Sequence, residues 1–113
     1  MGIYMVVQAL EYNEDDTRTI RNLYFMKNDS DLSIWFSDNL GRDLDYGPYY
    51  EFDHYTMNKL IAEYELALID KGEFANHPYM TKDECQEILT TLKDYKKNRG
   101  VNYEDTYFLF SQS

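Results

Sequence analysis

Residues 81–100 carry the clearest structural signal in the chain. Thr81 and Glu84 are spaced as a capping box, and Met80 and Cys85 flank it as a hydrophobic staple. Gly100 stands where helices commonly end, after a last turn rich in Lys and Arg that suits the negative end of a helix dipole. Between the two ends runs an apolar stripe at helical spacing: Ile88, Leu89, Leu92 and Tyr95. The segment therefore predicts a helix.

A second helix is predicted just upstream of this one. Asp53 or Thr56 can cap its start, and it runs to about Lys71, with Gly72 directly after it. Its apolar face is formed by residues three and four apart: Met57, Leu60, Ile61, Tyr64, Ala67 and Leu68.

Four further segments have the composition of strands: residues 3–12, 19–27, 32–37 and 102–113. Residues 3–12 are rich in Val, Leu and Tyr, which predicts a strand buried on both faces or nearly so. After an acidic turn at 13–16, residues 19–27 form a second strand, in which Ile20 is expected to share a face with Tyr24 and Met26, and Leu23 with Phe25. The C-terminal residues 102–113 predict a last strand.

Residues 32–37 follow a turn at 28–31 and alternate in polarity. Leu32, Ile34 and Phe36 are expected to point inward, and Trp35 outward between two serines. An exposed tryptophan covers another surface or contacts a partner. The predicted order is therefore β-β-β-α-α-β. We expect a single acidic α+β domain over residues 1–113, in which a four-stranded, mostly antiparallel sheet packs two helices on one face.

An acidic, tyrosine-rich stretch, NLGRDLDYGPYYEFDHY, occupies residues 39–55. Gly41, Gly47 and Pro48 interrupt any regular element, so it is predicted to be a shaped loop. Tyrosines supply contact area and carboxylates attract basic partners, so we interpret the loop as a partner-binding surface. The alternative is a surface loop whose aromatic side chains fold back over the edge of the core.

The net charge limits the classes of partner. The chain carries −10 over 113 residues, with 12 tyrosines, so its acidity belongs to a folded body rather than to a disordered chain. Such a body repels phosphate, which argues against direct binding of nucleic acid and of anionic membranes. A lone Cys85 and an N-terminus without a signal-peptide pattern predict a cytoplasmic protein.

Motifs for catalysis, cofactors and metals are missing from the sequence. His54, His77 and Cys85 could in principle assemble, but Cys85 occupies the staple position of a helix, where an inert thiol is expected. A helix-loop-helix calcium site needs glycine at the sixth position of its loop and a bidentate glutamate at the twelfth. If the loop began at Asp43, these positions would be Pro48 and His54, so the pattern fails. We expect no enzyme activity, cofactor or metal.

Binding is the function that these observations favour. In size, charge and tyrosine content the chain is similar to small acidic phage and plasmid proteins that block restriction, CRISPR or repair enzymes by imitating DNA; no motif assigns it to a family of them. We predict an inhibitor, of this anti-defence and DNA-mimic type, that occupies a basic, nucleic-acid-binding surface of a partner protein. The residues expected to bind the partner are Trp35, Asp43, Asp45, Tyr46, Tyr49, Tyr50, Glu51 and Asp53.

Two other functions fit the same composition. An immunity or antitoxin protein would neutralise a nuclease toxin through the same charges. A phage structural or assembly protein would instead use its aromatic side chains to associate with itself.

Overall fold

The computed structural model describes residues 4–27, 30–75 and 80–113. Its elements are β1 (Tyr4–Tyr12), β2 (Arg18–Lys27), α1 (Ser30–Leu40), β3 (Tyr49–Phe52), α2 (His54–Leu68), α3 (Lys82–Arg99), the 3-10 helix η1 (Gly100–Asp105) and β4 (Tyr107–Gln112). The described chain is α+β. None of its helices is both long and apolar enough to cross a membrane.

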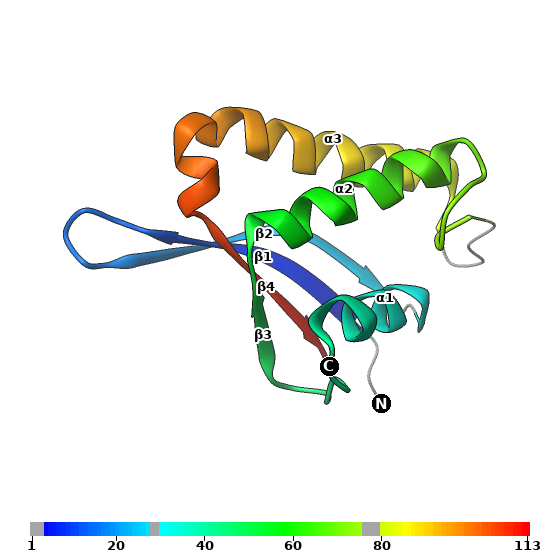
Figure 1. The fold of residues 1–113 in the computed structure, drawn as a ribbon, viewed down its shortest axis with the longest axis horizontal. Coiled ribbons are helices and arrows are strands. Elements are labelled where there is room, and N and C mark those ends of the chain that lie inside the picture. The colour runs from blue at the N-terminus through cyan, green and yellow to red at the C-terminus, as the bar shows by residue number, and fades with distance from the viewer. Residues whose placement is uncertain (1–3, 28–29, 76–79) are drawn as a thin grey trace.

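The four strands form one antiparallel sheet in the order β2-β1-β4-β3 (Figure 1). The β1–β2 hairpin projects beyond the helices, at the left of the figure. The last strand, β4, lies between β1 and β3 and so links the first and third strands. One row of the register aligns Tyr24, Val7, Phe110 and Tyr50 across the sheet, which places these side chains on one face.

All three α-helices pack on that face. Phe36 of α1 stacks on Phe110 of β4, with ring centroids 4.1 Å apart. The hydroxyls of Tyr64 in α2 and Tyr24 in β2 lie 2.8 Å apart, and Tyr95 of α3 meets Phe108 of β4 edge-on. These contacts gather the core between the helices and one side of the sheet.

The opposite side of the sheet bears no helix in the described part of the chain, and we call it the open face. By the register, its residues are Arg18, Ile20, Asn22, Phe25 and Lys27 of β2; Tyr4, Val6, Gln8, Leu10 and Tyr12 of β1; Tyr107, Leu109 and Ser111 of β4; and Tyr49 and Glu51 of β3. Residues 5–11 of β1 are all buried or half-buried, which confirms the expectation of a strand buried on both faces or nearly so, and only Tyr4 and Tyr12 at its ends are exposed.

The strand prediction for residues 32–37 is wrong, because they lie in α1. Leu32, Trp35 and Phe36 are buried, whereas Ile34 is 57% exposed, which is helical spacing and not alternation. The peptide Leu-Ser-Ile-Trp-Phe-Ser fits both patterns, so only packing against the sheet decides between them. The order is β-β-α-β-α-α-β, and three helices cover the sheet where two were expected. Residues 28–29 of the predicted turn lie outside the described residues.

The third strand comes from inside the predicted loop. β3 is only four residues long, and its Tyr50 and Phe52 face the core while Tyr49 and Glu51 face outward. Gly47 and Pro48 directly precede β3 and are typical of loops, so the sequence does not reveal a strand this short. The irregular part of the predicted loop therefore shortens to residues 41–48.

A β-bulge in β2 corrects the expected faces of that strand. The register shifts opposite Val7 and Gln8, which leaves Leu23 as an extra residue. The extra residue resets the alternation, so Ile20 lies on the open face with Phe25 instead of on the core face with Tyr24 and Met26. Both Ile20 and Phe25 are exposed as a result.

The caps of the two long helices are confirmed. The Asp53 carboxylate accepts a hydrogen bond from the Thr56 N–H at 3.0 Å and begins α2. The Thr81 hydroxyl accepts one from the Glu84 N–H at 3.1 Å and begins α3, which ends at Gly100 with φ of 56°. The last strand is shorter than predicted, because residues 100–105 form η1.

The Thr81 cap gives the first prediction. Thr81→Ala should lower the free energy of unfolding by about 1 kcal/mol, because the Glu84 N–H in the first turn loses its acceptor. The matched control is Thr91→Ala on the exposed side of the same helix, where alanine has the higher helix propensity. Chemical denaturation measures both. Equal effects of the two changes would show that the cap contributes nothing.

A buried carboxylate, Glu11, joins β1 to α3. The Tyr95 hydroxyl donates to its Oε2 at 2.5 Å, Arg21 Nε donates to its Oε1 at 3.0 Å, and Arg99 Nε lies 4.0 Å from Oε2. Burial alone would raise the pKa of Glu11, but the two hydrogen bonds and the two guanidinium charges outweigh it and hold this pKa below its usual range.

The lowered pKa of Glu11 makes stability depend on pH. The contribution of Glu11 to the free energy of unfolding is complete above its unfolded-state pKa, about 4.3. It is lost as pH falls through the lower pKa of the folded state. Glu11→Gln should therefore destabilise the protein at neutral pH, and the difference from wild type should shrink in acid. Unfolding at both pH values, with Glu14→Gln at the exposed hairpin tip as control, tests this. A difference that stays constant with pH would contradict it.

Candidate partner-binding surface

We call residues 41–48, between α1 and β3, the acidic loop. Its first turn is tied to α1: the Arg42 N–H donates to the Ser37 carbonyl at 3.2 Å, and the Ser37 hydroxyl donates to the Arg42 carbonyl at 2.7 Å. The Arg42 guanidinium lies over the Tyr50 ring, 5.0 Å from its centroid. Its charge is thus directed to an aromatic face of β3.

The far half of the acidic loop is tied to the end of β4. The Gly47 N–H donates to the Gln112 carbonyl at 2.7 Å, and Gln112 Nε2 donates to the Leu44 carbonyl at 3.3 Å. The Asp45 N–H donates to the Tyr50 hydroxyl at 2.8 Å. Gln112 is itself fixed by the Ser33 hydroxyl, which donates to its Oε1 at 2.9 Å. Contacts with α1, β3 and β4 therefore define the conformation of the loop.

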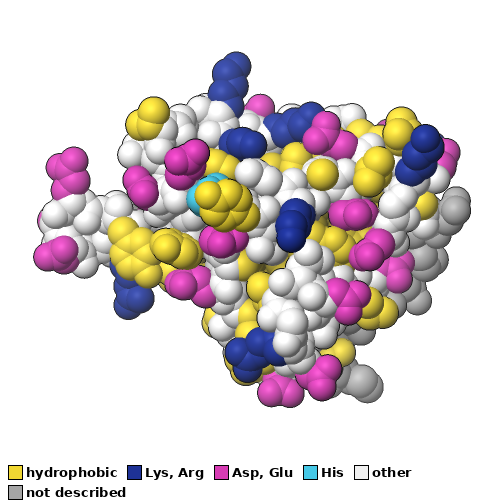
Figure 2. All heavy atoms as spheres, viewed as in Figure 1, with side chains coloured by type: hydrophobic (Ala, Val, Ile, Leu, Met, Phe, Trp, Pro, Cys, Tyr) yellow, Lys and Arg dark blue, Asp and Glu magenta, His cyan; other side chains and the backbone are white. Residues whose placement is uncertain are grey.

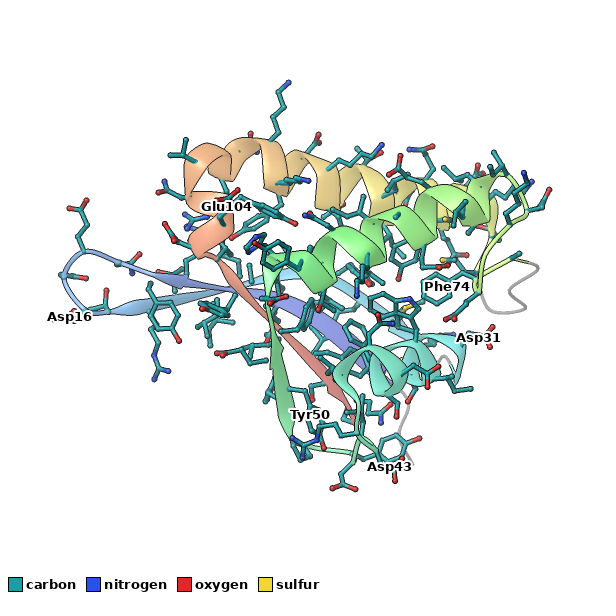
Figure 3. All side chains as sticks on the ribbon, in the orientation of Figure 1. Asp16, Asp31, Asp43, Tyr50, Phe74 and Glu104 are labelled. Carbon is teal, nitrogen blue, oxygen red and sulfur yellow. The ribbon has the colours of Figure 1, made fainter. Side chains whose placement is uncertain are left out.

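The acidic loop directs its carboxylates to solvent. Asp43, Asp45 and Tyr46 are exposed, and Tyr49 and Glu51 adjoin them at the β3 edge of the open face. Figure 3 labels Asp43 at the lower end of the molecule, and Figure 2 shows Asp and Glu side chains there beside a Lys or Arg side chain. Within the described residues, no ion pair neutralises Asp43, Asp45 or Glu51. The surface offers negative charge beside aromatic area.

Three of the predicted binding residues are structural instead. Trp35 is 2% exposed and lies against Phe36 and Phe74 in the core. Tyr50 is 8% exposed, and its hydroxyl holds the acidic loop. Asp53 caps α2. The structure thus brings together only the other five predicted residues, at the acidic loop and the adjoining edge of β3.

The sequence did not point to the open face as a candidate surface. Among the described residues, six of the twelve exposed large apolar side chains lie on it: Tyr4, Tyr12, Ile20, Phe25, Tyr49 and Tyr107. The alternation of Tyr4, Val6, Leu10 and Tyr12 along β1 was an available signal. It was hidden by the equally apolar residues between them, and the bulge in β2 has no signature in the sequence.

Groups suited to chemistry are scattered. Cys85 is buried, burial raises the pKa of its thiol, and it donates to the Tyr64 carbonyl at 3.4 Å. His54 lies against Tyr55 at the start of α2, and His77 lies outside the described residues. Among the described residues, no group of three His, Cys, Asp or Glu side chains could hold a metal ion. A groove of about 570 Å³ between β2 and α3 is lined by no residue of the acidic loop.

Comparison with protein families, with curated proteins and with solved structures found no match to this chain.

The Tyr50 hydroxyl gives a prediction for the loop. Tyr50→Phe removes the acceptor of the Asp45 N–H, so it should cost about 1 kcal/mol of stability and speed hydrogen exchange at the Asp45 amide. Tyr49→Phe is the matched control, because the Tyr49 side chain is exposed and its hydroxyl has no partner among the described residues. If both variants exchange at the wild-type rate at Asp45, Tyr50 does not hold the loop.

Proposed function

We propose that this protein is a small acidic inhibitor that binds a basic, nucleic-acid-binding surface of a partner protein. One observation carries the proposal: the carboxylates of Asp43 and Asp45 are exposed, form no ion pair within the described part of the chain, and lie on a loop whose backbone is fixed by hydrogen bonds at both ends. A loop that is ordered before binding loses little conformational entropy on binding.

In the proposed contact, aspartates supply the charge and a tyrosine supplies the contact area. Asp43 and Asp45 provide the attraction, which acts on the rate of association because solvent screens such charges until contact. Tyr46 is 59% exposed between them and the sheet, and offers a rigid aromatic side chain to bury. Tyr49 and Glu51 border this surface.

The overall charge supports the same partner class. A body with a net charge of −10 is attracted to surfaces that have evolved to bind the phosphate backbone. The protein would act stoichiometrically in the cytoplasm, as a DNA mimic does, and would bind no nucleic acid itself. An immunity protein that neutralises a nuclease would use the same interactions.

The test begins with capture of the partner from the source cell on the immobilised protein. Duplex DNA added as a competitor should release the partner, because both would occupy one basic surface. Asp43→Lys with Asp45→Lys should then slow association on the order of tenfold and flatten its dependence on salt, without loss of thermal stability. Binding kinetics at two ionic strengths measure this.

The matched control is Glu87→Lys with Asp94→Lys on exposed α3. Each reversal adds two charges, so both double variants change the formal net charge from −10 to −6. The control should retain most of the association rate if the acidic loop is the contact. Equal slowing in both variants would mean that only net charge matters, and a partner that DNA does not displace would overturn the proposal.

A further inference from the structure

The open face of the sheet is chemically unlike the acidic loop. At its centre Leu10 is buried and Val6 and Leu109 are half-buried, and exposed aromatic and aliphatic side chains surround that centre. Tyr12 and Tyr107 meet edge-on at 6.1 Å near the base of the hairpin. An exposed apolar sheet face on a protein is typically covered by another surface.

Negative charge is nearly absent from the open face. Although the chain has 21 acidic residues, Glu51 on β3 is the only one that the strands direct to this side. Two cations, Arg18 and Lys27, lie on it along β2. A basic partner would meet these cations and exposed apolar side chains, so the open face does not suit the partner of the acidic loop.

The charges on the open face complement each other across the sheet. The order β2-β1-β4-β3 puts the cations at one edge and Glu51 at the other. A two-fold axis parallel to the strands, midway between two facing sheets, lays β2 of each copy over β3 of the other. By the register, Phe25 then approaches Tyr49 of the second copy, and Glu51 faces Asn22, between Arg18 and Lys27 of the second copy.

The extent of the open face suits such contact. Four strands about 4.8 Å apart and up to about 30 Å long present roughly 500 Å² of flat area, more when side chains are included. A stable interface buries about 800 Å² per partner, so the open face and its rim approach that size. Pairing through the free edge of β2 is less favourable, because its bulge and its like-charged Arg18, Arg21 and Lys27 oppose it.

We propose that two copies of this chain form a homodimer by packing their open faces together. Tyr49 and Glu51 then belong to the dimer contact, and both acidic loops stay accessible at its rim. The inference does not depend on the identity or existence of a basic partner.

The test is sedimentation of the purified protein over a range of concentrations, at low and at high sodium chloride. The dimer should tighten as salt rises, because screening reduces repulsion between two bodies of charge −10 while apolar contact is not weakened. Binding of a basic partner through the acidic loop has the opposite salt dependence. A protein that stays monomeric at all concentrations would overturn the proposal and leave the open face to another macromolecule.

Two pairs of variants locate the contact. Phe25→Ala should weaken dimerisation roughly 30-fold, as expected for a buried aromatic contact. Tyr55→Ala on α2 is the control, because Tyr55 is 67% exposed and Phe25 62%. Tyr49→Ala should also weaken the dimer, and its effect should not add fully to that of Phe25→Ala, because the register brings these two side chains together across the contact. A dimer that responds to Tyr55→Ala but not to Phe25→Ala would place the contact elsewhere and contradict the proposal.

Discussion

The stacking of Phe36 on Phe110 is the contact on which the rest of the arrangement depends. The two rings lie 4.1 Å apart and nearly parallel, and Phe52 packs against Phe36 at 5.0 Å. This cluster joins α1 to β3 and to β4, and β4 is distant from α1 in sequence. Because Ser37 follows Phe36 directly and holds Arg42, docking of α1 also sets where the acidic loop begins.

The sheet separates two surfaces with different chemistry. Its helix-covered side holds the core, and its open face holds half of the large apolar side chains that remain exposed in the described chain. The acidic loop lies where β3 and β4 meet α1, beside the open face, and the Ser111 hydroxyl of that face donates to the Gly47 carbonyl of the loop at 3.5 Å. The carboxylates proposed to attract a basic partner and the apolar side chains proposed to pack against a second copy belong to different residues, Asp43 and Asp45 in the loop and Ile20 and Phe25 in β2.

Local signals predicted the parts of the fold that local interactions determine. Thr81 and Asp53 cap their helices through residues three positions away, so the sequence was sufficient to place α3 and the start of α2. Residues 32–37 fit two patterns, and only the contact of Phe36 with Phe110, 74 positions later, decides for a helix. The same long-range packing buries Trp35 and Tyr50, which is why two expected anchors are core residues. The exposed carboxylates of the loop needed no such contact and were predicted as exposed.

Hydrogen exchange on the protein bound to its captured partner is the most direct test of the central claim, that the acidic loop is the contact surface. Backbone amides of residues 41–48 that face solvent should exchange more slowly in the complex than in the free protein, while the exposed surfaces of α2 and α3 should be unchanged. Slowed exchange confined to α3 or to the hairpin tip at residues 13–17, with residues 41–48 unaffected, would contradict the claim.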